Sequence, residues 1–426
     1  MSAERLHMGW FRHADQLLNL IRPPTPVGTV VRDYFRNFPR LGAQDRHAIT
    51  DLACDLARQP WLLRHIDQHL PDAADGDRSF AGFLLQHPDR AADALNRWSR
   101  ADALRPILEV PLPAPPTGPP TDVLAFHGLP TWWAADLARS GLEDVAAISA
   151  FAGAMRTRAP LDLRVNQNRM DRASVLTRLQ SAAPNAAPAP WAPTAIRCPS
   201  GFNVEGHPLY TDGIVEIQDE GSQLIIQCMD DLENGSSIID ACAGGGGKTL
   251  AMAARWPDAS LQAWEVNDRR FGDIRQRAAR AGASITCRMW PDREPSDSDR
   301  ADLVLVDAPC SGSGTLRRSI SAIMDEREVR RLQGVQLEVL RRASRWVRPA
   351  GTLMYATCSV LHRENEAVAA RFLEQDPSFE LIPVVLGRSA KGDESTLVRE
   401  GFLRLWPHLH GTDGFFAARF RRRSGR

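Results

Sequence analysis

Two short apolar runs, each ending abruptly before a reactive side chain, constrain the fold of this chain more than any other feature. The run 303–306 is branched and wholly apolar up to Asp307, which is typical of a strand buried on both faces of a parallel sheet. The run 352–356 follows a long helical pattern and a turn, and it ends shortly before Cys358. Because ligands bind beyond the carboxyl ends of such strands, we expect a doubly wound α/β sheet that brings Cys310 and Cys358 into one site. Two unrelated core cysteines are the alternative.

A glycine-rich loop upstream strengthens this interpretation. The stretch 236–249 is typical of a strand, a loop with four consecutive glycines and a helix that begins near Lys248, and such glycines let the backbone approach a ligand closely. The end of this stretch resembles the Walker A motif of a P-loop NTPase. That motif requires a glycine five positions before Gly247, where this chain has Cys242, so the spacing argues against an NTPase.

The next expected strand, 261–265, ends in Glu265, roughly twenty residues after the loop. An acid at this place can accept hydrogen bonds from both hydroxyls of a ribose, which favours a nucleoside cofactor over the alternative of an ordinary solvated acid. Lysine usage also singles out Lys248, because the 52 basic residues include only two lysines, Lys248 and Lys391. This usage indicates that position 248 requires a compact ammonium group and not a guanidinium.

These stretches carry a resemblance to one enzyme family. The segments 240–249, 307–314 and 356–360 resemble the first, fourth and sixth motifs of the RsmB/NOP (NSUN-type) family of S-adenosylmethionine-dependent RNA cytosine-5 methyltransferases, and above all its bacterial RsmB-like rRNA enzymes. Two further segments are similar to family signatures. Residues 218–223 resemble the signature before the cofactor strand, and residues 413–417 resemble the C-terminal hairpin.

The resemblance implies a class I (Rossmann-like) methyltransferase domain that methylates carbon 5 of a cytosine in RNA, with ribosomal RNA as the expected substrate, through a covalent cysteine–cytosine adduct. It assigns the nucleophile to Cys358, and it assigns to Cys310 the removal of the carbon 5 proton and the release of the enzyme. Asp307 and Lys248 would hold the cytosine edge, and no metal is expected. The cofactor, S-adenosyl-L-methionine, would contact Cys242, Ala243, Gly244, Gly245, Gly246, Gly247, Lys248, Glu265, Arg270, Asp292 and Asp307.

Two positions depart from the family pattern. The family usually has Ala-Pro where this chain has glycines at 244–245, which predicts a more flexible loop and a larger ordering cost on cofactor binding. Asp292 follows Met-Trp-Pro and does not lie in the usual small polar turn, so a surface acid is the alternative to a contact with the adenine. Two other functions also fit the sequence. One is a DNA cytosine-5 methyltransferase, which would use Cys310 and would not need Cys358, and the other is a non-catalytic RNA-binding ribosome assembly factor that kept the fold.

The amino-acid composition limits the possible binding partners and indicates the cellular compartment. Basic and acidic residues number 52 each, so the whole molecule is no general polyanion binder, and any RNA contact must be local. Seven scattered cysteines without a Cys-x-x-Cys pair argue against a disulfide framework and structural zinc, and they predict a cytoplasmic protein. We also expect a monomer with no leader and no membrane span. Candidate RNA contacts are Arg317, Arg318, Arg327, Arg330, Arg331, Arg341, Arg342 and the tail 419–426, for which a solubilising end is the alternative.

The chain of 426 residues, 43% of them hydrophobic, is long enough for two or three cores. Apolar positions repeat at helical spacing in the first hundred residues, where 31–46 resembles the NusB-like RNA-binding domain of some bacterial family members; a plain helical module is the alternative. A strand at 160–166 and a helix at 172–180 predict a small α/β subdomain, in which Arg164 and Asn166 match the strand motif of the family's RNA-recognition-like subdomain. The expected organisation is a helical domain at 1–104, a proline-rich linker at 105–121, a linking region with the subdomain at 122–233, the methyltransferase domain at 234–421 and a basic tail at 422–426.

Overall fold

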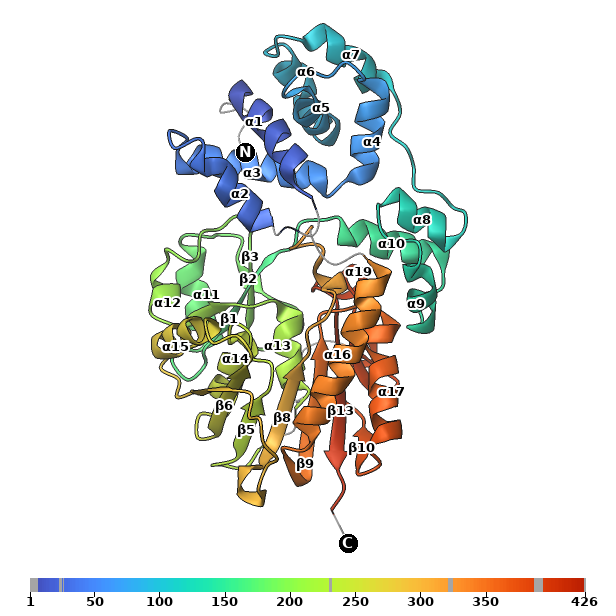
Figure 1. The fold of residues 1–426 in the computed structure, drawn as a ribbon. Helices are drawn as coiled ribbons and strands as arrows, with labels where there is room; N and C mark the ends of the chain where they lie inside the picture. Colours follow the sequence, from blue (N-terminus) through green and yellow to red (C-terminus); the bar gives the residue numbers. More distant parts are fainter. Residues whose placement is uncertain are drawn as a thin grey trace. The chain divides into compact units, whose positions relative to one another are not determined.

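The architecture comes from a computed structural model, which describes residues 7–22, 25, 27–229, 232–320, 325–386 and 394–424 (Figure 1). The chain forms two compact units, one of residues 1–158 and 316–324 and the other of residues 159–315 and 325–426. Lys391 and the last two residues of the expected basic tail lie outside the described residues. Within the described ranges, no helix combines the length and the apolar character that crossing a membrane would require.

The first unit is helical, as expected for the N-terminal region. Leu17 and Leu18 are buried on its first helix, so the helical spacing of apolar residues reflects packing against neighbouring helices. Trp98 stacks on Phe80 and meets Phe11 edge-on in the core of this unit. The helices are α1 (Met8–Leu20), α2 (Val27–Arg36), α3 (Ala43–Ala57), α4 (Pro60–His69), α5 (Asp77–Gln86), α6 (Pro88–Leu95), α7 (Ala101–Glu109), α8 (Pro120–Phe126), α9 (Trp133–Arg139) and α10 (Val145–Met155).

The proline-rich stretch begins within a helix. Pro106 lies inside α7, which ends three residues later at Glu109, so only one turn loses a backbone donor. Residues 111–119 then form neither helix nor strand. Helix α8 begins at Pro120, a position where the missing N–H costs nothing because the first turn has no internal acceptor for it.

The second unit begins with a small four-stranded antiparallel sheet in the order β2-β3-β1-β4. Along its central strand β1, Leu163 and Val165 pack in an apolar core with Val175 of helix α11, whereas Asp162 and Arg164 point to the opposite face. The strand and the helix expected here are therefore present. The elements are β1 (Leu161–Val165), α11 (Arg172–Gln180), β2 (Ala187–Pro188), β3 (Ala195–Cys198), α12 (Pro208–Thr211) and β4 (Val215–Ile217).

Among the residues that the structure describes, the large sheet of this unit has nine strands, in the order β11-β12-β13-β9-β8-β5-β6-β7 with β10 paired to β13. Strands β5 to β9 are parallel, which confirms the expected doubly wound sheet. Strand β13 runs antiparallel between β9 and β12, so the expected C-terminal hairpin is present, and residues 419–422 of the basic stretch belong to this strand. The strands are β5 (Ser237–Asp240), β6 (Ser260–Glu265), β7 (Thr286–Met289), β8 (Ala301–Asp307), β9 (Val347–Thr357), β10 (Phe379–Ile382), β11 (Val398–Arg399), β12 (Phe402–Leu405) and β13 (Phe415–Arg422).

Helices cover both faces of the large sheet (Figure 1). Leu303 and Leu305 of β8 pack with α13 and α14, whereas Val304 and Val306 pack with α16 and α17. The strand is thus buried on both faces, as its unbroken apolar run predicted. The strand order reverses between β5 and β8, and sheets of this kind bind ligands beyond the carboxyl ends of strands at that point. The helices are α13 (Glu220–Gln227), α14 (Gly247–Arg255), α15 (Arg270–Ala281), η2 (Asp297–Asp299), η3 (Ser313–Thr315), α16 (Glu326–Ser344), η4 (His362–Glu364), α17 (Glu366–Gln375), α18 (Glu394–Leu397) and α19 (Pro407–His410).

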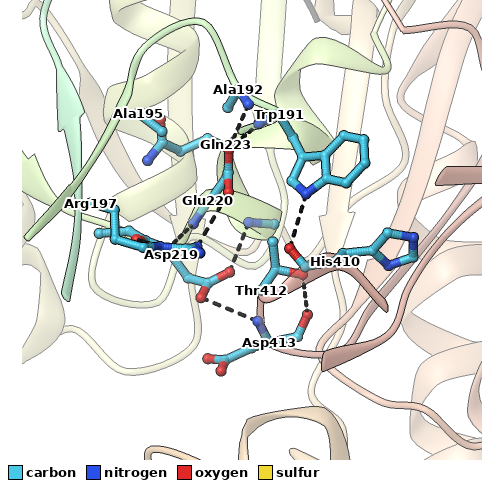
Figure 2. A network of polar contacts seen from close by, with 12 residues as sticks. Trp191, Ala192, Ala195, Arg197, Asp219, Glu220, Gln223, His410, Thr412 and Asp413 are labelled. Atoms are coloured by element: carbon cyan, nitrogen blue, oxygen red, sulfur yellow. Dashed lines mark hydrogen bonds and ion pairs between the residues drawn. The ribbon is translucent and has the colours of Figure 1, made fainter. Parts of the chain in front are cut away.

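A polar network joins the small sheet to the turn before β13 (Figure 2). Arg197 of β3 forms ion pairs with Asp162 at 2.8 Å and with Glu220 at 3.3 Å. Burial raises the pKa of Glu220 to about 7, because it outweighs the backbone hydrogen bonds from Ala192 and Trp191 and the charge of Arg197. The adjacent Asp219 accepts a hydrogen bond from the backbone of Asp413 at 3.3 Å. The small sheet and the C-terminal hairpin are therefore both held at the start of α13, close to the carboxyl edge of the large sheet.

Candidate active site

The carboxyl ends of β8 and β9 bring the two cysteines together. These strands pair in parallel register up to Asp307 and Ala356, and each then turns into a loop that carries a cysteine. The sulfurs of Cys310 and Cys358 lie 3.3 Å apart, and both residues are half-buried. The hydrogen bond with Cys358, followed by burial, raises the pKa of Cys310 well above its ordinary value. Cys310 is therefore a protonated thiol at neutral pH.

An ion pair between Lys248 and Asp307 lies at the same edge of the sheet. Lys248 is in the first turn of α14 and Asp307 ends β8; the Nζ and Oδ2 atoms are 2.8 Å apart, and the lysine side chain is only 11% exposed. Burial lowers the pKa of Lys248, but the Asp307 carboxylate outweighs burial and Cys358 adds to its effect, so the pKa is raised. Nζ also lies 5.7 Å from the ring centre of Phe415 on β13. The ammonium group is thus a fixed positive charge within electrostatic reach of Cys358.

The glycine loop between β5 and α14 has the backbone shape of a ligand cradle. Gly244 has a φ of +54° and Gly246 a φ of +79°, in the left-handed region that favours glycine. Gly246 also precedes the first turn of α14, whose free backbone N–H groups therefore face the loop. A Cβ atom at Gly246 would lie 3.2 Å from Ile274 of α15, so the loop packs closely on that helix. Burial raises the pKa of Cys242 at the start of the loop, which keeps its thiol neutral.

Glu265 ends β6 beside this loop. Its Oε2 atom accepts hydrogen bonds from the Gly244 N–H at 3.0 Å and from Arg270 at 3.2 Å. Its Oε1 atom accepts hydrogen bonds from the next two backbone N–H groups. The Arg270 side chain is 54% exposed, so a ribose hydroxyl can replace this one contact without opening the core. The acid is therefore placed to bind a ribose next to the glycine loop.

A buried oxygen beneath the loop lacks a hydrogen-bond partner. Asp240 ends β5, and its Oδ2 accepts a hydrogen bond from Thr249 at 2.6 Å, but its Oδ1 has no partner among the described residues. Burial raises the pKa of Asp240 to about 7. Left-handed glycines, an acid within reach of a ribose and an unpaired acceptor together fit a nucleoside cofactor, which residues 242–247 and Glu265 would hold.

Asp292 is the remaining acid expected in the site. It follows β7 and lines a surface cavity of about 360 Å³ with Trp290, Arg342 and Trp346. Over the ranges that the structure describes, no hydrogen bond or ion pair joins Asp292 to Glu265. The structure brings the other expected site residues together at the carboxyl edge of the sheet, and Asp292 follows β7, whose Met289 pairs with Glu265 at that same edge.

The arginines expected to contact RNA are largely engaged within the protein. On α16, Arg330, Arg331 and Arg341 form ion pairs with glutamates three or four residues before them. Arg419 and Arg422 of β13 donate hydrogen bonds to backbone carbonyl groups. Exposed pairs between helix neighbours contribute only about 0.3–0.5 kcal/mol each, so the α16 arginines can exchange them for a phosphate at little cost.

Glu364, a buried acid at this edge of the sheet, is not among the site residues predicted from the sequence. Its carboxylate accepts hydrogen bonds from the hydroxyls of Ser311 and Ser359. The chain around Glu364 is rich in charged residues and resembles an ordinary exposed helix start, which hides the burial. The one available signal is that both cysteines, Cys310 and Cys358, are followed by serine.

Comparison with known proteins adds independent information. The family model described as 16S rRNA methyltransferase RsmB/F matches residues 227–421, and the model of the RsmF/B-like ferredoxin-like domain matches residues 129–205. The crystal structure of a protein named PH0851 has a TM-score of 0.71, is 22% identical and covers 98% of this chain and 99% of that chain. This last likeness concerns the fold alone.

Two curated relatives match this chain over stretches of similar length. "Probable ribosomal RNA small subunit methyltransferase B" of Bacillus subtilis is 31% identical over 268 residues, which are 61% of this chain and 59% of the relative. "Ribosomal RNA small subunit methyltransferase B" of Salmonella arizonae is 33% identical over 267 residues, which are 62% of this chain and 59% of the relative. The chain thus spans about three fifths of the length of the curated relatives that it matches.

Proposed function

Because this chain belongs, through residues 129–205 and 227–421, to the RsmB/F family of 16S rRNA methyltransferases, we propose that it transfers a methyl group from S-adenosylmethionine to carbon 5 of a cytosine in ribosomal RNA. The observation that carries this proposal is the pair of thiols, Cys310 and Cys358, 3.3 Å apart at the ends of neighbouring strands. Two sulfurs in one site suit a reaction that needs one nucleophile and one thiol that handles a proton.

The chemistry of cytosine sets the order of events, because its carbon 5 is a poor nucleophile. The thiolate of Cys358 adds to carbon 6, which forms a carbon–sulfur bond and turns carbon 5 into the nucleophilic end of an enamine. S-adenosylmethionine, when bound, supplies an electrophilic methyl group for that carbon. Loss of the carbon 5 proton then restores the double bond, and Cys358 leaves as a thiolate.

The other residues of the site divide the remaining tasks. Cys310 assists the removal of the carbon 5 proton and the release of the enzyme. Because its raised pKa keeps it protonated in the free protein, it must first give up its own proton before it can accept the one from carbon 5. Lys248 and Asp307 hold the cytosine edge. The loop 242–247, Glu265 and Arg270 would hold the cofactor, and we keep Asp292 as a candidate for its adenine end.

We also propose that local contacts, and not overall charge, bind the RNA. Basic and acidic residues balance, so contacts must come from particular elements such as α16. Arg342 of this helix lies over the Trp290 ring at 4.9 Å from its centre, which is a surface on which an unpaired base can stack. We further propose that the helical domain at 1–104 and the subdomain within 122–233 contribute to RNA binding, and that the protein acts as a monomer.

The two cysteine variants test the covalent route. Replacing Cys358 by alanine removes the attacking sulfur, so neither an adduct nor methylated RNA should form. Cys310→Ala should still attack and methylate but release the RNA slowly, which leaves a protein band covalently joined to RNA on a denaturing gel. Cys287→Ala, on β7 and outside the site, is the matched control and should behave as wild type.

Opposite behaviour would contradict this assignment. An RNA-linked band from Cys358→Ala, with none from Cys310→Ala, would show that the two roles are reversed, as in a DNA cytosine-5 methyltransferase. A wild-type protein that binds ribosomal RNA and S-adenosylmethionine but forms no methylated product would instead favour an assembly factor that kept only the fold.

A further inference from the structure

A buried carboxylate lies directly behind the two cysteine loops. Glu364 ends the short helix η4 between β9 and α17, and its side chain is fully buried. Its two oxygens accept four hydrogen bonds, and no ion pair to this carboxylate is found in the part of the chain that the structure describes. A buried charge without a counter-ion is costly, so this carboxylate depends on its hydrogen bonds.

Three of the four bonds come from the residues that follow the cysteines. The backbone N–H and the hydroxyl of Ser311 donate to the carboxylate at 2.8 and 2.6 Å, and the hydroxyl of Ser359 donates at 2.6 Å. Ser311 follows Cys310 and Ser359 follows Cys358 in the chain. The Oε2 atom accepts from both hydroxyls, so a single oxygen joins the two loops.

Neighbouring groups tighten the same junction. Gln336 of α16 donates to Glu364 at 2.9 Å and to the carbonyl of Pro309, just before the first cysteine, at 3.0 Å. The backbone N–H of Gly314 donates to the carbonyl of Cys358 at 2.9 Å. Hydrogen bonds thus connect the loop of Cys310 with the loop of Cys358, and most of these bonds end on the Glu364 carboxylate.

We propose that Glu364 is a positioning residue, which holds the Cys310 and Cys358 loops at the sulfur separation that formation and release of the covalent adduct require. This inference rests on the proposed function. A carboxylate suits the task because it has only acceptors, about four lone-pair sites, and all four are used here. A glutamine has nearly the same shape, but its amide group would present donors to two serine donors.

The charge of Glu364 has a second effect on the site. The pKa of Cys310 is raised first by the hydrogen bond with Cys358 and then by burial, and the Glu364 carboxylate adds to both. Removal of this charge should therefore make Cys310 easier to deprotonate. A buried residue whose charge did not reach Cys310 would not change the titration of this thiol, so the titration reports the Glu364 charge and kcat reports the position of the loops.

The test compares Glu364→Gln with Glu366→Gln in the full chain. Glu366 lies two residues further on, is largely buried and pairs with Arg404 outside the cysteine loops. We expect Glu364→Gln to lower kcat for RNA methylation about 100-fold, as a displacement of about 1 Å does, with little change in the KM for RNA. Glu366→Gln should keep kcat and lose stability. Glu364→Asp, which keeps the acceptors on a shorter stem, should recover part of the rate.

Alkylation by iodoacetamide provides a readout that needs neither RNA nor cofactor. Mass spectrometry of the peptide that contains Cys310 should show modification at lower pH in Glu364→Gln than in wild type, whereas Glu366→Gln should leave the profile in place. If Glu364→Gln does not fold, Ser359→Ala replaces it. That variant removes the Ser359 hydroxyl, which donates to Glu364, contacts the Ser313 hydroxyl at 2.9 Å and accepts from the Leu361 N–H, and it should lower kcat about 10-fold.

The two proposals fail in different ways. Wild type that methylates RNA, together with a folded Glu364→Gln variant whose kcat and Cys310 alkylation profile are unchanged, would overturn the inference about Glu364. If wild type methylates no RNA, but Cys310 is alkylated at lower pH in Glu364→Gln as expected, the proposed function is refuted and the effect of Glu364 on the Cys310 thiol is supported.

Discussion

Asp240, the buried acid beneath the glycine loop, makes stability depend on pH in a direction that the structure defines. Its pKa rises from 3.8 to about 7, chiefly because of burial; the hydrogen bond from Thr249 opposes the rise, Asp307 adds to it and Lys248 opposes it. Between these two pKa values the folded protein binds a proton that the unfolded chain does not. Stability attributable to this group therefore falls as pH rises and levels off above about 7.

The magnitude follows from the two pKa values. Raising the pH from about 5 to about 8 should cost the wild type about 2–3 kcal/mol through this group alone. Asp240→Asn removes the titration but also places amide donors in a buried position, and that penalty does not depend on pH. The informative quantity is therefore the change with pH in the difference between the two proteins, and not the difference at one pH.

Urea titration with hydrogen exchange as the readout measures this quantity. The peptide that covers β5 (Ser237–Asp240) reports the opening of the second unit, so the two units need not unfold together. The stability of Asp240→Asn relative to wild type should rise by about 2–3 kcal/mol between pH 5 and pH 8. If the unfolding free energies of the two proteins differ by the same amount, within about 0.5 kcal/mol, at pH 5 and at pH 8, then burial does not hold this acid protonated.

Three further predictions concern the cofactor, the loops and the substrate. S-adenosylmethionine at about 100 times its Kd should stabilise the protein by about 2.7 kcal/mol in a thermal shift assay; a similar shift with ATP and magnesium, and none with the methyl donor, would contradict the cofactor. Gly314→Ala should cost about 1–3 kcal/mol in urea unfolding, because its Cβ atom would lie 2.1 Å from the Gly414 carbonyl oxygen. Gly334→Ala, which meets no atom within 4 Å on α16, is its control and should be neutral or slightly stabilising. Ribosomal RNA should accept methyl groups faster than single-stranded or duplex DNA in a tritium transfer assay, and the reverse order would point to the DNA enzyme.

Sequence reasoning succeeded where local patterns determine the outcome. The unbroken apolar run of β8 can only be buried on both faces, and the ends of adjacent parallel strands must lie at one edge, so the meeting of Cys310 and Cys358 followed from two short segments. The glycine loop could also be predicted from a local pattern, since the left-handed backbone at Gly244 and Gly246 favours glycine.

What the sequence did not predict depends on long-range contacts. Glu364 is buried because α16 and two loops close over it, and nothing within its own segment signals that burial. Glu220 likewise becomes a buried acid only when the small sheet supplies Arg197. Conversely, the arginines of α16 were expected to be available for RNA, but they pair with glutamates of the same helix. Those glutamates lie three or four residues away, so helical spacing could have predicted the pairs.

Bisulfite mapping of RNA incubated with this protein tests the central claim most directly. Ribosomal and transfer RNA lacking the modification would be treated with wild type or with Cys358→Ala in the presence of S-adenosylmethionine, and then sequenced for cytosines that resist conversion. We predict one or a few protected cytosines in ribosomal RNA with wild type, and none with Cys358→Ala. Ribosomal RNA without a protected cytosine, or equal protection by Cys358→Ala, would contradict methylation of cytosine carbon 5 through a Cys358 adduct.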